Sequence, residues 1–148
     1  MEFQIIPKQE VIPEFESRAI AVKYIEYDSD YEEDDITEDV IAKVLQQIPS
    51  GIEVVLYLDP GGEDDWLEVL CDGKWMALGF SGDSGQNNYY SYNADFSGSE
   101  DLTPLLSGGQ SPVEKYLAIQ DMEAGVKAVE YFIRTGGLYP GIDWAVQL

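Results

Sequence analysis

The sequence predicts an α+β domain in which an antiparallel sheet of five or six strands packs against two main helices. Several short segments rich in Val, Ile, Leu and aromatic residues are separated by turn residues, which is typical of strands. Two other segments repeat apolar residues every three or four positions, as one face of a helix does. A chain of 148 residues is long enough for one core, so we treat residues 1–148 as a single domain.

The first part of the chain is expected to be only partly regular. Residues 1–17 contain two prolines and four glutamates, which predicts an extended lead-in with one short strand at residues 3–6. Residues 19–27 have the β-rich composition of a longer strand. In residues 28–39, eight of twelve side chains are acidic and none is basic, so we expect a solvated loop.

The first helix is expected to begin directly after this acidic loop. Thr37 is a suitable N-cap, because its hydroxyl can accept a hydrogen bond from the first turn. Ile36 precedes the cap and is placed to pack on Ile41 as a hydrophobic staple. Pro49 and the glycine that follows it are expected to end the helix.

The central part of the chain predicts most of the sheet. Residues 52–58, 66–71 and 74–80 are β-rich, and Asp72-Gly73 suits the tight turn of a hairpin between the last two. Residues 88–93 form a tyrosine-rich strand.

The segment before the second helix has weaker signals. Residues 97–112 contain two prolines and a Gly-Gly pair, which predicts a loop. Residues 113–119 are expected to form a short strand that leads into the helix.

The C-terminal helix has the clearest boundaries. Asp121 is the expected N-cap, Gly136 follows the last turn, and Pro140 prevents continuation. Beyond it, apolar residues alternate with others up to the C-terminus, which predicts a final strand with Trp144 on the buried face. The apolar face of the helix is expected to contain Met122, Val126, Val129, Phe132 and Ile133.

The charge of the chain limits its partners. Asp and Glu number 29 against 8 Lys and Arg, for a formal net charge of −21. Nucleic acid and anionic membranes are excluded as partners, because their phosphates require a basic patch. Strong self-repulsion favours a monomer and a basic protein partner. A lone Cys71 and the absence of a basic leader or long apolar run predict a cytoplasmic protein.

Several kinds of chemistry have no support in the sequence. Histidine is absent, which removes the commonest general base and metal ligand. Residues 79–85 lack the ending of a phosphate-binding loop, and no nucleophile elbow is present. Carboxylates near the tryptophans could mimic a glycosidase pair, but such pairs are expected by chance in so acidic a chain. We therefore expect no enzyme activity, no cofactor and no resident metal.

A calcium- or ligand-binding module is the alternative that the acidic loop leaves open. Asp28, Asp30 and Glu32 have the spacing of EF-hand ligands, and Asp34 would join them. However, Glu33 stands where that loop needs glycine, and Asp39 stands where a bidentate glutamate is usual. The pattern therefore favours a solvated acidic loop.

The tyrosines indicate a protein-binding surface. They are too many to fit inside a small core, and Tyr is enriched where one protein binds another. Carboxylates would accelerate encounter with a basic partner, while aromatic side chains would provide affinity by burial. The expected partner-binding residues are Asp28, Asp30, Tyr31, Glu32, Glu33, Asp34, Asp35, Glu63, Asp64, Asp65, Trp66, Tyr89, Tyr90 and Tyr92.

The C-terminal stretch also resembles a known family. Its order of residues is similar to the end of a family of bacterial immunity proteins, immunity family one, which are found beside polymorphic toxins. A Trp-containing hairpin and the Tyr-rich strand upstream fit the same family more loosely, and residues 1–49 carry no matching motif. The residues that carry the resemblance are Ile119, Asp121, Ala124, Ala128, Val129, Phe132, Thr135, Gly136, Pro140 and Trp144.

The resemblance implies an α+β protein that binds the toxin domain of its cognate effector and blocks it. Toxins paired with such proteins are mostly nucleic-acid deaminases and nucleases, which need a basic groove for their substrate. A chain with net charge −21 could occupy that groove as the phosphates would. A nucleic-acid mimic that acts on another basic protein remains a third interpretation. The matched residues are mostly apolar, Gly and Pro positions that support the fold, so none is carried over as a contact residue.

Overall fold

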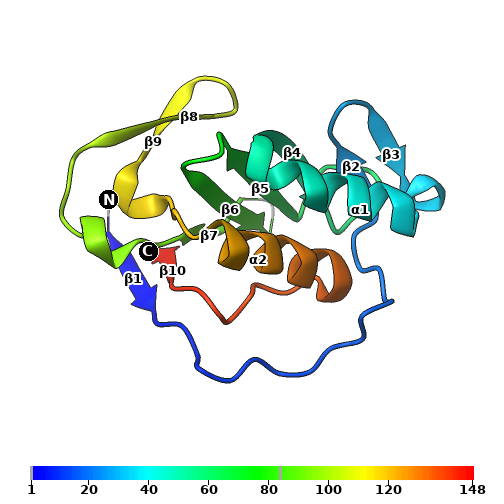
Figure 1. The fold of residues 1–148 in the computed structure, drawn as a ribbon, viewed down its shortest axis with the longest axis horizontal. Coiled ribbons are helices and arrows are strands. Elements are labelled where there is room, and N and C mark those ends of the chain that lie inside the picture. The colour runs from blue at the N-terminus through cyan, green and yellow to red at the C-terminus, as the bar shows by residue number, and fades with distance from the viewer. Residues whose placement is uncertain (1, 84) are drawn as a thin grey trace.

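An antiparallel sheet of eight strands runs through the centre of the protein (Figure 1). The structure is a computed structural model that describes residues 2–83 and 85–148. From one edge to the other, the strands are β1 (Phe3–Ile6), β10 (Trp144–Gln147), β7 (Asn87–Ser91), β6 (Met76–Gly82), β5 (Trp66–Cys71), β4 (Ile52–Tyr57), β2 (Tyr24–Glu26) and β3 (Asp30–Glu32).

Both helices, α1 (Glu38–Gln47) and α2 (Met122–Thr135), cover the same face of the sheet. Every second residue of a strand points toward this face. Val54 of β4 and Val69 of β5 are therefore fully buried, in one core with Phe132 of α2. The α+β class, the antiparallel sheet and the two helices agree with the sequence prediction.

The helix ends follow from local side chains. The Thr37 hydroxyl accepts a hydrogen bond from the Val40 N–H at 3.3 Å, and the Asp121 carboxylate accepts one from the Ala124 N–H at 3.1 Å. Gly136 ends α2 with a φ of 75°, a left-handed conformation that a Cβ disfavours. Both predicted N-caps and the predicted C-terminal glycine are confirmed.

An ion pair joins the two helices. The Arg134 guanidinium donates two hydrogen bonds of 2.7 Å to the Glu38 carboxylate, and the Arg134 side chain is only 6% exposed against 59% for Glu38. A third hydrogen bond from Arg134, of 3.4 Å, reaches the Ala19 carbonyl, and its Nε has no hydrogen-bond partner among the described residues. The bidentate contact is therefore the main compensation for burying this charge.

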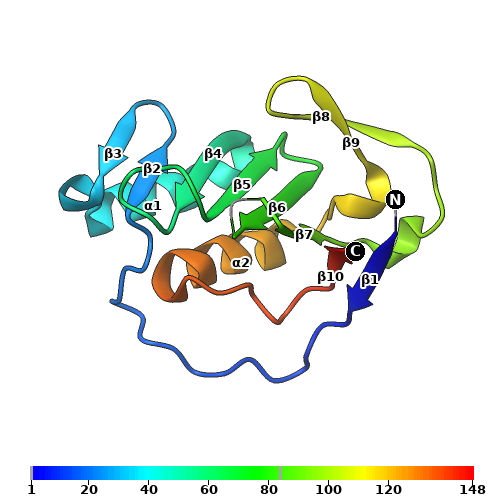
Figure 2. The same ribbon diagram turned by 180° about the vertical axis from the view of Figure 1, so that it is seen from behind.

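A second, two-stranded sheet covers part of the opposite face. It is the hairpin of β8 (Leu102–Ser107) and β9 (Ser111–Glu114), and Figures 1 and 2 show it and α2 on opposite sides of the main sheet. Its buried apolar side chain, Leu105, packs with Leu70 of β5 and Trp75 in a second apolar cluster.

The prediction of a loop at residues 97–112 is therefore wrong, and so is the predicted strand at residues 113–119. The chain forms β8 in the first of these ranges, and β9 begins at its end and continues to Glu114 in the second. After Glu114 it turns into a short 3₁₀ helix, η4 (Lys115–Leu117), and Ile119 makes an isolated bridge to Met76.

The structure also corrects the predictions for residues 19–27 and 28–39. Only β2 forms in the first range, because the Ala21 N–H donates to the Ile133 carbonyl at the end of α2 and not to a strand. In the acidic range, β3 pairs with β2, and a 3₁₀ helix, η1 (Glu33–Asp35), follows it.

The main sheet has eight strands, so the predicted five or six were too few. The short edge strand β1 coincides with the strand predicted at residues 3–6, whereas the other edge strand, β3, lies in the range predicted as a loop. The final strand is confirmed as β10, and Trp144 is 4% exposed on the helix side, as expected. No helix among the described residues has the length and apolar character needed to cross a membrane.

Candidate protein-binding face

The main sheet has a second face, opposite the helices, which we call the open face. Its side chains alternate along each strand with those of the main core, and the antiparallel register aligns them across the sheet. The open-face residues are Phe3, Ile5, Tyr24, Glu26, Asp30, Glu32, Glu53, Val55, Tyr57, Trp66, Glu68, Leu70, Ala77, Ser81, Asn88, Tyr90, Ala145 and Gln147.

Three aromatic side chains form a row across neighbouring strands of the open face. Tyr24 of β2 is paired with Tyr57 of β4, which is paired in turn with Trp66 of β5. The first two rings meet edge to face with centroids 5.6 Å apart, and the second pair is tilted with centroids 6.1 Å apart. All three side chains are half-buried. We call these residues the aromatic row.

Carboxylates surround the aromatic row and affect its hydroxyls. The pKa of Tyr24 is raised by a hydrogen bond to the Asp30 carboxylate, then by burial and by the charges of Asp30, Glu26 and Glu32. The pKa of Tyr57 is raised first by burial and then by nearby carboxylates, including Glu26 and Asp30. Glu26 and Asp30 contribute to both shifts, so the two hydroxyls share a carboxylate-rich environment.

No positive charge lies on any strand of the part of the chain that the structure describes. The cationic side chains come from helices, turns and the segment before β2, and four of them form ion pairs with carboxylates. The open face therefore has dense negative charge with no cation of its own strands to neutralise it. The cationic residues are Lys8, Arg18, Lys23, Lys43, Lys74, Lys115, Lys127 and Arg134.

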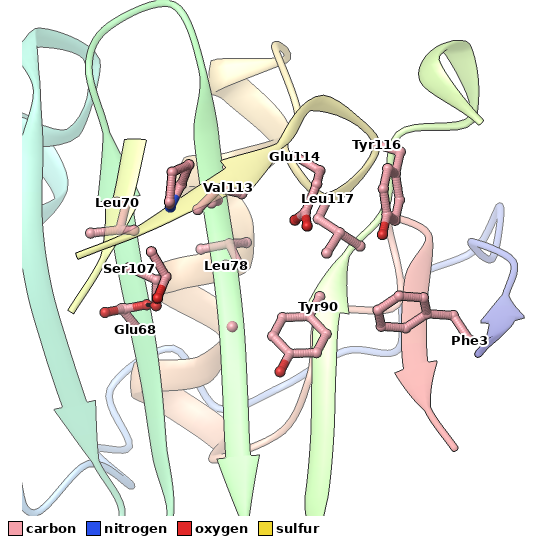
Figure 3. Close-up of a pocket in the computed structure, with 14 residues that line it drawn as sticks. Phe3, Glu68, Leu70, Leu78, Tyr90, Ser107, Val113, Glu114, Tyr116 and Leu117 are labelled. Carbon is pink, nitrogen blue, oxygen red and sulfur yellow. Dashed lines mark hydrogen bonds between the residues drawn. The ribbon is translucent and has the colours of Figure 1, made fainter. Parts of the chain in front are cut away.

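A cavity of about 410 Å³ lies between the open face and the β8–β9 hairpin, and we call it the hairpin groove (Figure 3). A second space, of about 320 Å³, begins beside it and reaches Trp66 of the aromatic row. The two spaces share Glu68, Gly79, Tyr90 and Ser107. The hairpin groove is lined by Phe3, Glu68, Leu70, Ala77, Leu78, Gly79, Tyr90, Ser107, Ser111, Pro112, Val113, Glu114, Tyr116 and Leu117.

Glu68 fixes the hairpin to the main sheet. Its carboxylate accepts a hydrogen bond of 2.6 Å from the Ser107 hydroxyl and one of 3.0 Å from the Gly108 N–H. Both of its oxygens are therefore engaged, and the position of the hairpin over β5 depends on this contact as well as on Leu105.

Aromatic rings form the far wall of the hairpin groove. Phe3 meets Tyr90 and Tyr116 edge to face, with centroids 5.9 and 6.1 Å away. The pKa of Tyr90 is raised by burial and then by the charges of Glu114 and Glu68, and the Tyr90 hydroxyl lies 3.3 Å from the Gln147 side-chain oxygen. Carboxylates therefore lie near the tyrosines both of the aromatic row and of the groove.

The predicted partner-binding residues of the acidic range do not all lie on one surface of the protein. Tyr31 points to the helix side, where it packs on the main core, and its hydroxyl donates a hydrogen bond of 2.8 Å to Asp28. Lys43 of α1 pairs with Asp28, and its hydrogen bond, followed by that of Tyr31, lowers the pKa of that carboxyl. Glu33 pairs with Lys23 at 3.0 Å.

The rest of the acidic range is more exposed. Asp30 and Glu32 lie on the open face beside the aromatic row. Glu32 and Asp35 cap each other around η1, and the Asp35 carboxylate accepts a hydrogen bond of 3.3 Å from the Glu32 N–H. Asp34 is exposed within η1.

The predicted turn residues are organised by Asp59. The Asp59 carboxylate accepts hydrogen bonds from the N–H groups of Glu63 at 2.7 Å, Asp64 at 3.0 Å and Asp65 at 3.3 Å. Burial alone would raise the pKa of Asp59, but these N–H groups lower it. Asp65 also accepts a hydrogen bond of 2.9 Å from the Asp83 N–H. These hydrogen bonds hold the backbone of the turn in place directly before Trp66.

The three tyrosines of β7 and the residues after it that were predicted to bind a partner also lie in different places. Tyr89 faces the helices, packs on the main core and meets Phe80 with centroids 6.2 Å apart. Tyr90 lies on the open face in the hairpin groove. Tyr92 lies beyond the end of β7, is half-buried, and its N–H donates to the Asp143 carbonyl at 3.0 Å.

Sequence reasoning did not select several residues of this face. Glu26, Tyr57 and Glu68 point to the same side as Trp66 only because of strand alternation and register. Glu114 at the end of β9 and Tyr116 of η4 line the groove on this side. The alternation along β4 and β5 was a usable signal. It separates the two faces, although it does not say which face the helices cover.

The described residues contain no group of three or more His, Cys, Asp or Glu side chains placed to hold a metal ion. No protein-family model matches the chain, and no curated protein matches it.

Proposed function

We propose that this protein is an immunity protein that binds a cognate bacterial toxin domain in the cytoplasm and neutralises it by occlusion. The observation that carries the proposal is the open face, where an aromatic row lies among carboxylates on strands that contain no lysine or arginine. A toxin that acts on nucleic acid needs a basic groove for its substrate. A negatively charged face is complementary to such a groove in charge, and its aromatic side chains can anchor the contact by burial.

Charge and burial have separate roles in this proposal. The net charge of −21 accelerates encounter with a basic partner and makes it sensitive to salt. The aromatic row supplies the apolar area that sustains a complex after encounter, and Trp and Tyr are frequent hot spots of protein interfaces. Leu106 of the hairpin, which is 45% exposed, lines a space with Glu53 and Leu70 and adds apolar surface next to the same face.

The proposal is tested by co-expressing the chain with the toxin encoded beside it. The unchanged protein should restore growth and co-purify with the toxin. Trp66→Ala should weaken the complex by about 2 kcal/mol or more, roughly 30-fold, if Trp66 is a hot spot. Glu26→Lys should weaken it by slowing association.

The matched control for Glu26→Lys is Glu123→Lys, which changes the net charge equally on the exposed surface of α2. We expect this control to retain most of the protection. Failure of the unchanged protein to restore growth or to form a complex would count against the proposal. Equal loss in both charge variants would show that the open face is not the contact surface.

A nucleic-acid mimic that acts on another basic protein would use the same open face. The same co-purification separates the two functions, because such a mimic would leave the neighbouring toxin unbound. The calcium-binding alternative is favoured by no observation, since the oxygens of Asp28 already accept hydrogen bonds from Tyr31 and Lys43.

A further inference from the structure

The hairpin groove contains one carboxylate that nothing in the described structure neutralises. Glu114 is half-buried at the end of β9, and no hydrogen bond or ion pair from a described residue reaches its side chain. Figure 3 shows the Glu114 carboxylate on the hairpin side of the groove, across from the rings of Tyr90 and Phe3. The other acid of the groove, Glu68, already accepts hydrogen bonds from the hairpin.

The walls around Glu114 are largely apolar. Leu70 and Ala77 of the main sheet, together with Val113 and Leu117 on the hairpin side, line the space between the two carboxylates. A cavity of about 410 Å³ is of the size that binds small organic groups, which is roughly 300–1,000 Å³. An occupant of this space must therefore bring both apolar area and a way to satisfy Glu114.

The chemistry of the groove selects among possible occupants. A neutral apolar group would remove Glu114 from water without giving it a partner, which is costly. An anion would be repelled by both Glu114 and Glu68. A long basic side chain satisfies both requirements, because its methylene stem covers apolar walls while its charged end reaches a carboxylate.

Arginine fits this groove better than lysine. Its planar guanidinium can form two parallel hydrogen bonds to one carboxylate and can lie against an aromatic ring, and the groove offers the Glu114 carboxylate and the Tyr90 ring. Lysine presents a compact charge that keeps its hydration shell more strongly.

We propose that the hairpin groove is a slot for one arginine side chain of the partner protein, with Glu114 as the acceptor of its guanidinium. The identity of the partner rests on the proposed function, but the slot itself does not. The stem of the arginine lies between the hairpin and β6, and the Tyr90 ring flanks the guanidinium. One projecting arginine of a basic partner would then anchor it beside the aromatic row.

The slot can be tested without the toxin. The probe is the peptide acetyl-Gly-Arg-Gly-amide, and the readout is the chemical shift of the Val113, Leu117 and Tyr90 side chains of the full chain. We expect saturable shifts at these residues, weaker shifts with the lysine peptide, and none with the peptide that carries neutral citrulline.

Glu114→Gln keeps the shape of the side chain and should weaken binding of the arginine peptide by about tenfold or more, because the charged acceptor is lost. Glu123→Gln on α2 is the control and should leave binding unchanged. Shifts spread over the whole acidic surface, or equal binding of the citrulline or lysine peptide, would overturn the proposal. The peptide comparison uses the unchanged protein, so it tests the arginine slot even if Glu114→Gln fails to fold.

The outcomes of this test are separate from those of the proposed function. If the arginine peptide binds but the protein fails to neutralise the toxin, the proposed slot is supported and the proposed immunity function is contradicted. If the protein neutralises the toxin but does not bind the peptide, the proposed immunity function is supported and the proposed slot is contradicted.

Discussion

Replacement of Phe132 by alanine should destabilise the protein strongly while leaving the binding surface intact. Phe132 lies on α2, is 1% exposed and packs against Phe80 with ring centroids 5.9 Å apart. It is therefore a fully buried side chain on the side of the sheet opposite the aromatic row. Truncation of a buried Phe to Ala typically costs about 3–5 kcal/mol, from lost transfer free energy and the remaining cavity.

That cost is a large part of the stability of a domain of this size, which is about 5–15 kcal/mol. With a urea m value of about 2 kcal/mol per molar, the midpoint of unfolding should fall by about 1.5–2.5 M while m stays unchanged. Urea unfolding followed by tryptophan fluorescence measures both quantities. The control is Phe15→Ala. Phe15 is 38% exposed and contacts Tyr131, so its replacement should lower the urea midpoint much less.

Toxin binding by the Phe132→Ala variant tests whether Phe132 only supports the fold. Protection against the toxin should be lost only in proportion to the fraction of Phe132→Ala protein that is unfolded. A Phe132→Ala variant that is folded by circular dichroism and urea unfolding yet cannot bind the toxin would show that the helix side is the working surface.

Three further predictions concern charge. Glu38→Gln should lower the thermal midpoint more than Glu123→Gln does, because it leaves the buried Arg134 guanidinium without its main partner, whereas Glu123 pairs with Lys127 at an exposed site. The raised pKa values of four tyrosines mean that the folded protein holds their protons more tightly than the unfolded chain. This contribution to stability is present below about pH 10 and is lost as pH rises through the folded pKa values, so the urea midpoint should fall in that range. These residues are Tyr24, Tyr57, Tyr90 and Tyr116. Raising NaCl from 0.15 to about 1 M should raise the thermal midpoint of the free protein, because screening reduces self-repulsion, and should slow association with the toxin.

The helices could be predicted from the sequence because their signals are local. Thr37 and Asp121 supply caps within one turn, and apolar residues recur at helical spacing, so neither helix depends on distant contacts for its boundaries. The long central strands, β4 and β5, were predictable for the same reason, since each is a short local run of β-branched, aliphatic and aromatic residues.

The β8–β9 hairpin was missed because its signal depends on tertiary contacts. Pro104 within β8 is typical of a loop, yet a strand at the edge of a small sheet tolerates a residue without an N–H. Only Thr103 and Leu105 of β8 are buried, and Leu105 is buried against Leu70 of a distant strand. The short strand β3 was missed because acidic residues hide the single apolar contact of Tyr31 with the core.

That the surface binds a protein stays a prediction, and only the placement of its residues can be compared with the structure. Dense carboxylates and many tyrosines indicated a protein-binding surface, and Trp66 and Tyr90 do lie on the open face. Composition cannot separate Tyr89, which faces the core, from its neighbour Tyr90. That separation needs the register of β7 against β6 and the side on which the helices pack.

The most direct test of the open face as the contact surface is carboxylate footprinting of the toxin complex. Carbodiimide labelling followed by mass spectrometry compares the reactivity of each carboxylate in the free and bound protein. We predict that Glu26, Asp30 and Glu32 lose reactivity in the complex, while Asp39 of α1 and Glu123 of α2, both exposed, keep theirs. Protection of the helix carboxylates, with unchanged labelling beside the aromatic row, would contradict the account.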